Sequence, residues 1–141
     1  MIHFKLVAPG DVKFDEEVYE VVVPTGDGPI ALFEDHMPLL SAGSPGVISV
    51  RKEPIDSDEA LVHFAVSGGV LQVDGKTARY LSDEVTTPDE VSEQAAAEAH
   101  GRAQEMMKNA PDRMALEEAK HMLHHSAAHL HLAKLKKRHH H

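Results

Sequence analysis

Two histidine-containing stretches hold the side chains that could carry out chemistry in this chain. The first is FEDHMPLL, residues 33–40, in which His36 follows Glu34 and Asp35. A histidine beside a carboxylate can act as a general base when a substrate pocket and a second reacting group lie close by. No nucleophile motif or glycine-rich phosphate loop accompanies it in the sequence. We therefore favour a histidine that shapes or contacts a loop, because a lone polar residue is a weak catalytic signal.

The second stretch lies near the C-terminal end and contains five histidines: His121, His124, His125, His129 and His131. At about 100° per residue, His121, His125 and His129 fall on one line of a helix, roughly opposite a line of leucines. Histidines four residues apart can chelate zinc or nickel, but each pair supplies only two protein ligands. Imidazole also titrates at about pH 6.5. We expect a solvated helix face, with a pH switch or a metal site formed by these three histidines as the alternatives.

The residues before Thr87 carry the patterns of short strands. Ile2, Phe4 and Leu6 alternate with polar residues, which is typical of a half-buried strand. Similar runs, rich in β-branched and aromatic residues, occupy 17–25, 28–33, 46–52, 60–66 and 76–81. Turn dipeptides separate them, and Asp74-Gly75 predicts a hairpin. We expect the pair Gly68-Gly69 to mark a bulge or a close backbone approach rather than a phosphate site, because a strand follows it.

The hydrophobic period changes at Thr87 from that of strands to that of helices. Thr87-Pro88-Asp89-Glu90 has the residues of a helix start, and Asn109–Asp112 interrupts the helical pattern. Beyond it, two sets of residues recur every seven positions: Leu116, Leu123 and Leu130, and Ala119, Ser126 and Ala133. This seam predicts an antiparallel helical hairpin, which the narrow apolar stripe makes less stable than the preceding domain.

The fold class that follows is β + α. We predict an N-terminal antiparallel β-sandwich of about ten short strands over residues 1–86, followed by a C-terminal antiparallel α-helical hairpin over 87–138. Residues 139–141 are three histidines that resemble a purification-tag remnant, so no function is assigned to them.

Composition limits the classes of function. The chain has 141 residues, no cysteine and a formal charge of −9, which argues against disulfides, thiolate zinc sites and nucleic acid as a partner. The sequence has no membrane-spanning apolar run and no secretory signal pattern, so we expect a soluble intracellular protein. Residues 112–141 carry a net charge of +3, concentrated in KLKKR (134–138). This segment is either a basic tail with an acidic docking surface or a solvated helix end.

Three stretches together resemble the epsilon subunit of F-type ATP synthase. They are TGDGPIALFEDHMPLL (25–40), PGVISV (45–50) and AVSGGVLQVDGKTARYLSDE (65–84). The chain departs from the family pattern at Glu34-Asp35, where Pro-Gly is usual, so the turn must be built differently. It also departs in the ATP-associated motif of many bacterial members, because Ser92 replaces the aspartate and Ala95 the arginine. Without that guanidinium we expect neither an ATP site nor any other cofactor.

The resemblance implies a non-catalytic rotor subunit of the central stalk. The sandwich would pack on the gamma subunit and touch the c-ring, with the turns at 26–29 and 34–38 at the c-ring contact. The hairpin would reach the alpha and beta subunits and inhibit ATP hydrolysis. The residues assigned to the c-ring contact are Asp27, Gly28, Pro29, His36 and Met37, and those assigned to inhibition are Lys134, Lys136, Lys137 and Arg138. The place implied is the cytoplasmic face of the bacterial inner membrane, peripherally and without membrane insertion.

Two other classes of protein remain open at this point. One is a stand-alone histidine-rich metal-binding protein, which tight stoichiometric zinc binding would support. The other is a β-sandwich enzyme centred on His36, which would need a concave pocket with a second titratable group.

Overall fold

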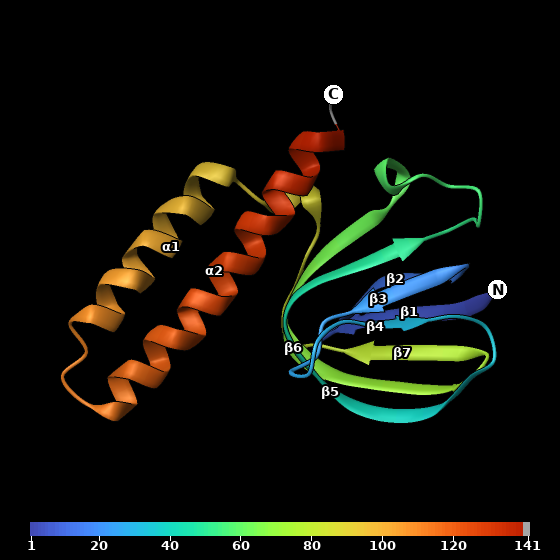
Figure 1. Ribbon diagram of the computed structural model, residues 1–141, viewed down its shortest axis with the longest axis horizontal. Helices are drawn as coiled ribbons and strands as arrows, with labels where there is room; N and C mark the ends of the chain where they lie inside the picture. Colours follow the sequence, from blue (N-terminus) through green and yellow to red (C-terminus); the bar gives the residue numbers. More distant parts are fainter. Residues whose placement is uncertain (140–141) are drawn as a thin grey trace.

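The computed structural model describes the backbone of residues 1–139 and the side chains of residues 1–136. Figure 1 shows a β-domain on one side and two helices on the other. The strands are β1 (Ile2–Ala8), β2 (Asp11–Val18), β3 (Glu20–Val23), β4 (Ile30–Leu32), β5 (His36–Arg51), β6 (Val62–Gly75), β7 (Thr77–Leu81) and β8 (Val85–Thr86). The helices are η1 (Asp58–Ala60), η2 (Pro88–Glu90), α1 (Glu93–Lys108) and α2 (Arg113–His139).

Two long bent strands join the layers of the sandwich. The strand order is β2-β1-β7-β6-β5-β3-β4, with β8 paired to β6. The first part of β6 pairs with β8 and its last part pairs with β7, so one strand serves both layers. All described pairs are antiparallel except β1 and β7, which run parallel. The β-sandwich prediction is confirmed, with eight strands in place of about ten.

Glycines explain the lower number of strands, because they let the chain bend without interrupting its backbone pairing. Gly43 of β5 lies opposite Gly69 of β6 at the bend. A Cβ atom on Gly69 would lie 2.1 Å from the carbonyl oxygen of Leu81, so no other residue fits there. The close backbone approach predicted at this glycine pair is confirmed.

The sandwich core is built by the alternation seen at the N-terminus. Ile2, Phe4 and Leu6 are fully buried, and the ring of Phe14 packs between those of Phe4 and Phe64. Tyr80 is buried at the centre, and burial raises its pKa to about 12. This core is large and continuous across both layers, which gives the helices a rigid surface to pack on.

The helix start predicted at Thr87 forms but is displaced from the first α-helix. The hydroxyl group of Thr87 donates to the Glu90 carboxylate at 2.8 Å, and this capping box starts only the short helix η2. Helix α1 begins at Glu93, where the Ser92 hydroxyl accepts a hydrogen bond from the Ala95 amide at 3.3 Å. Between the two helices, Val91 packs on the sandwich side of α2, which explains the interruption.

Helix α2 lies between α1 and the β-domain (Figure 1). The small residues of the predicted seam, Ala119, Ser126 and Ala133, are buried, as are Ala96 and Ala103 of α1. The leucines of the seam are only half-buried. A different face of α2, with Ala128 and Leu132, packs against Ala65, Val47 and Val91 in a second and smaller apolar cluster. The hairpin is thus attached to the sandwich through α2.

Candidate functional site

The turn at residues 25–28 is closed by its own hydrogen bonds. The Thr25 hydroxyl donates to the Gly28 carbonyl at 2.5 Å, and the Gly28 amide donates to the Thr25 carbonyl at 3.0 Å. Gly28 has a φ of +114°, which a residue with a Cβ adopts only under strain. The turn therefore presents Asp27 and Pro29 on a backbone of fixed shape.

The turn before β5 is tight even though Glu34-Asp35 stands where Pro-Gly is usual. The His36 amide donates to the Phe33 carbonyl at 3.3 Å, so residues 33–36 form a tight turn. Asp35 takes a φ of +62°, the conformation that glycine would otherwise supply, and its amide donates to the Gly75 carbonyl at 2.8 Å. Aspartate tolerates this left-handed conformation better than most residues. The turn is thus fastened to the β6–β7 hairpin.

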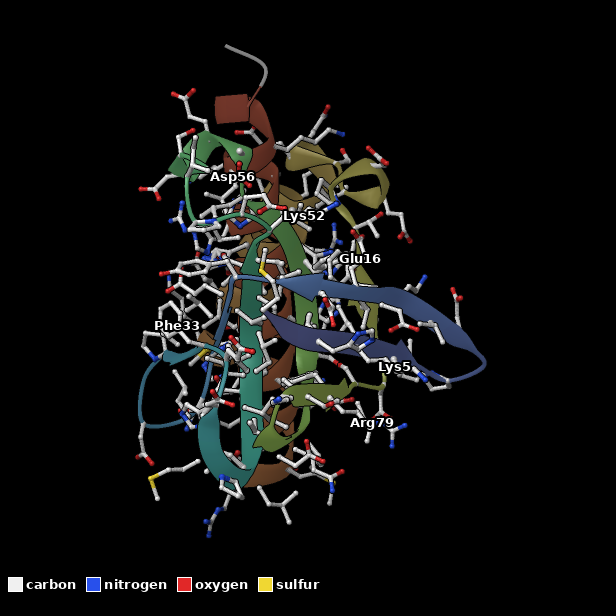
Figure 2. All side chains as sticks on the ribbon, turned by 90° about the vertical axis from the view of Figure 1, so that its right-hand side faces the viewer. Lys5, Glu16, Phe33, Lys52, Asp56 and Arg79 are labelled. Carbon is white, nitrogen blue, oxygen red and sulfur yellow. The ribbon has the colours of Figure 1, made fainter. Side chains whose placement is uncertain are left out.

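His36 interacts with its own loop. Its Nδ1 atom lies 2.8 Å from the carbonyl oxygen of Met37, which favours the loop-shaping interpretation over the catalytic one. Met37, the next residue, is 78% exposed. Figure 2 shows Phe33, just before this turn, on the opposite side of the molecule from Lys5 and Arg79.

The structure does not bring the two predicted contact turns together. Gly28 precedes β4 and Asp35 follows it, so the turns lie at opposite ends of that strand (Figure 1).

A surface that the sequence reading missed lies on the outer face of the sheet. Ala42, Val70 and Leu81 are cross-strand neighbours on β5, β6 and β7, and Val70 and Leu81 are each more than 40% exposed. Leu40, two residues before Ala42 on the same face, is 73% exposed. Together these four residues form the outer apolar row. Strand alternation predicts polar residues on an exposed sheet face, so the apolar residues at these positions were the signal available in the sequence.

An open groove of about 740 Å³ extends from this row towards the hairpin. It is lined by the backbone of Gly68 and Gly69, by Leu81 and Asp83, and by His121 of α2. The first histidine of the predicted stripe thus faces the sandwich across the groove.

The other two histidines of the stripe contact the sandwich directly. His125 Nε2 lies 3.0 Å from the Glu84 carboxylate, and His129 Nε2 lies 3.1 Å from the Thr86 hydroxyl. The two imidazole rings are 4.3 Å apart between centroids. The expectation of a solvated face was therefore wrong for His125 and His129, which are half-buried, whereas His121 is exposed. Helix α2 has α1 on one side and the β-domain on the other, so its line of histidines faces the sandwich (Figure 1).

The environment of His129 favours its neutral form. Burial lowers the pKa of this imidazole, and the neighbouring His125 lowers it further, while the Glu84 carboxylate opposes both effects. Neutral imidazole is also the form that binds metal ions. In the part of the chain whose side chains are described, Glu84, His125 and His129 form a group with metal-ligand spacing.

The basic end predicted to inhibit hydrolysis lies on the last turns of α2. Lys134 is exposed and Lys136 is half-buried, whereas the side chains of Lys137 and Arg138 lie outside the described residues. At the position of the degraded ATP motif, Ser92 and Ala95 together form the N-terminal cap of α1.

Neither of the two α-helices has the length and apolar character of a membrane-spanning segment, within the residues that the structure describes.

Comparison with known protein families gives consistent results. A family model described as the beta-sandwich domain of the ATP synthase delta/epsilon chain matches residues 1–88. The chain is 34% identical over 132 residues to the ATP synthase epsilon chain of Chromobacterium violaceum, a match that covers 94% of this chain and 89% of that one. It is 32% identical over 107 residues to the epsilon chain of Dichelobacter nodosus, covering 76% and 71%.

Two solved structures share the fold. One is the mitochondrial ATP synthase assembly of Euglena gracilis, with a TM-score of 0.79 at 18% identity over 90% of this chain and 78% of the matched chain. The other is the central stalk and c-ring of Tetrahymena thermophila mitochondrial ATP synthase, with a TM-score of 0.58 at 16% identity over 97% and 95%. From the family model and the long relatives, the chain belongs to the delta/epsilon family of ATP synthase, as one of its epsilon chains.

Proposed function

We propose that this epsilon chain couples c-ring rotation to ATP synthesis and that its hairpin can inhibit ATP hydrolysis. As an epsilon chain it is a subunit of ATP synthase without a catalytic centre of its own. The observation that carries the proposal is the division of the chain into a sandwich with one large core and a hairpin docked on it through a small cluster. A rigid body suits torque transmission, whereas a thinly attached element suits regulation.

The coupling role rests on exposed surface attached to rigid backbone. We propose that the sandwich contacts the gamma subunit and the c-ring, through the 25–28 turn, the 33–37 turn and the outer apolar row. The two turns are fixed by hydrogen bonds, and the row places Leu40 and Val70 in solvent on a continuous sheet. Exposed apolar residues on a rigid sheet are typical of a protein interface.

The inhibitory role rests on the thin attachment of the hairpin. The docking cluster holds three buried residues, Ala65, Ala128 and Leu132, of which only Leu132 is large. A docked and a released hairpin can therefore differ by a small free energy, so that a partner selects between them. In the released form, α2 would reach the alpha and beta subunits of the catalytic head.

The basic end would carry the inhibitory contact. Lys134, Lys136, Lys137 and Arg138 reverse the sign of charge that most of the chain carries, so they would approach acidic segments of the catalytic subunits. Replacing all four residues with alanine should weaken inhibition, and added salt should weaken inhibition by the parent chain. Equal inhibition by the variant and the parent would exclude the electrostatic account.

A reversible lock tests whether release of the hairpin is required. The chain has no cysteine, so Ala65→Cys with Ala128→Cys introduces one defined pair within the docking cluster. We expect the oxidised chain to bind the catalytic head without inhibiting ATP hydrolysis, and reduction to restore inhibition. Each single cysteine variant serves as the control for the substitution itself. Full inhibition by the oxidised chain would show that the docked hairpin already inhibits.

The proposed location follows from the bacterial relatives. We propose that the chain is a peripheral part of the complex at the cytoplasmic face of the bacterial inner membrane, held there by its protein partners. Fractionation of cells should recover it with membranes and release it together with the catalytic head. Recovery in a fraction without the other subunits would contradict this placement.

A further inference from the structure

We propose that Glu84, His125 and His129 form a binding site for a divalent transition metal, with Zn²⁺ as the best-matched ion, that fastens the hairpin to the sandwich. One ring nitrogen of each histidine and one carboxylate oxygen lie within 4.8 Å of one another. Two imidazoles and a carboxylate are a common set of three protein ligands for zinc, with water in the fourth position. The sequence offered only pairs of histidines, and the fold adds the third ligand from another domain.

The site needs only a small contraction to fit the ion. Zinc ligands at about 2.0–2.2 Å in a tetrahedron lie roughly 3.3–3.6 Å from one another. His125 Nε2 and the Glu84 carboxylate are already 3.0 Å apart, and the His125 and His129 rings differ by 36° in plane. The Glu84 side chain is 54% exposed and is therefore able to move towards His129.

The surroundings prepare the ligands for a metal. The Thr86 hydroxyl lies 3.1 Å from Nε2 of His129 and holds this ring against the sandwich. His121 lines the groove one turn earlier on α2 but is not part of the group, and His124 is exposed on another face.

The position of Glu84 gives the metal a mechanical effect. Glu84 immediately precedes β8 of the sandwich, whereas both histidines lie on α2, so the three ligands meet only while the hairpin is docked. An ion that binds the docked form more tightly shifts the equilibrium towards it. If the hairpin inhibits when released, as proposed above, zinc would relieve inhibition. That consequence rests on the proposed function, but the metal site itself does not.

Zinc titration by calorimetry tests the site on the isolated full-length chain. Every variant carries alanine at His139, His140 and His141, so that the terminal histidines do not bind the ion. We expect the parent to bind one zinc ion and the variant His125→Ala/His129→Ala to lose saturable binding. Glu84→Gln should bind zinc at least about tenfold more weakly than the parent. This is the lower end of the loss in metal affinity that follows removal of an outer-shell partner, and Glu84 is a direct ligand. The matched control His124→Ala/His131→Ala removes two exposed histidines of the same helix and should bind as the parent does.

Hydrogen exchange supplies the second readout. Zinc should slow exchange of the α2 amides in the parent and leave the α2 amides of Glu84→Gln much less protected. Equal zinc affinity in the parent and Glu84→Gln would overturn the proposal, since the helix alone would then hold the ion. Absence of saturable binding in the parent would overturn it as well. Neither result depends on ATP synthase activity, so failure of the site and failure of the proposed inhibition are distinguishable.

Discussion

Leu132→Ala should release the hairpin without unfolding the sandwich. Leu132 is fully buried and is the one large side chain among the buried residues of the docking cluster, where its buried companions are alanines. Small neighbours cannot fill the space that the substitution leaves, so the cost follows the known range for buried leucine. We take about 2–3 kcal/mol, the lower part of that range, because the site lies at an interface that can relax. At about 1.4 kcal/mol per factor of ten, the docking equilibrium shifts by about 30- to 150-fold.

Hydrogen exchange of individual amides measures this shift. The α2 amides open with the hairpin, so their exchange should accelerate by about the factor given above, while β1 amides in the sandwich core should keep their rates. Met114→Ala is the matched control, because Met114 lies on the same helix and is 81% exposed. Unchanged exchange in α2 would refute the docking role of Leu132. Equal acceleration in β1 and α2 would refute the idea that the hairpin opens as a separate unit.

Four further predictions concern the sandwich and the helix start. The Tyr80 hydroxyl is buried and has no hydrogen-bond partner among the described residues, so Tyr80→Phe should raise the free energy of unfolding in urea by about 1 kcal/mol, and a loss of stability would contradict this. Burial raises the pKa of Tyr80 to about 12, so the unfolded chain loses this proton at a lower pH than the folded chain does. The free energy of unfolding of the parent should therefore fall as pH rises from about 10 to 12. Tyr80→Phe should lack this contribution to the fall. Asp35→Ala should be less stable than Asp35→Gly by about 1 kcal/mol, since only glycine accepts a φ of +62° without cost, and equal urea midpoints would argue against a strained turn. Ser92→Ala should cost about 1 kcal/mol of α1 stability and increase exchange of the first-turn amides, whereas unchanged exchange there would show that the cap contributes nothing.

Local sequence patterns predicted the helices and strands better than they predicted how these elements are connected and packed. The alternation of Ile2, Phe4 and Leu6 identified a buried strand face because strand periodicity is a property of a few adjacent residues. The capping box at Thr87 was also real, yet it started only a short helical turn. Val91 packs against the cluster that contains Leu132 of α2. The two residues are more than 40 positions apart in the sequence, so no local pattern reveals this packing.

The histidine stripe shows the same limit at the candidate site. The sequence placed His121, His125 and His129 on one line correctly, because helix geometry fixes that line. It did not show what the line faces, since Glu84 and Thr86 reach it through the return of α2 over the sheet. The two predicted contact turns stay a prediction; the structure adds that Gly28 and Asp35, close in sequence, lie on either side of β4.

The most direct test of the account is ATP hydrolysis by a cognate catalytic head from which its epsilon chain has been removed. The head is titrated with the full chain or with a version that ends at Thr86, after the last strand. The account predicts that both forms associate tightly and that only the full chain inhibits. Equal inhibition by the two forms would contradict the role of the hairpin, and absence of association by either would contradict the rotor role itself.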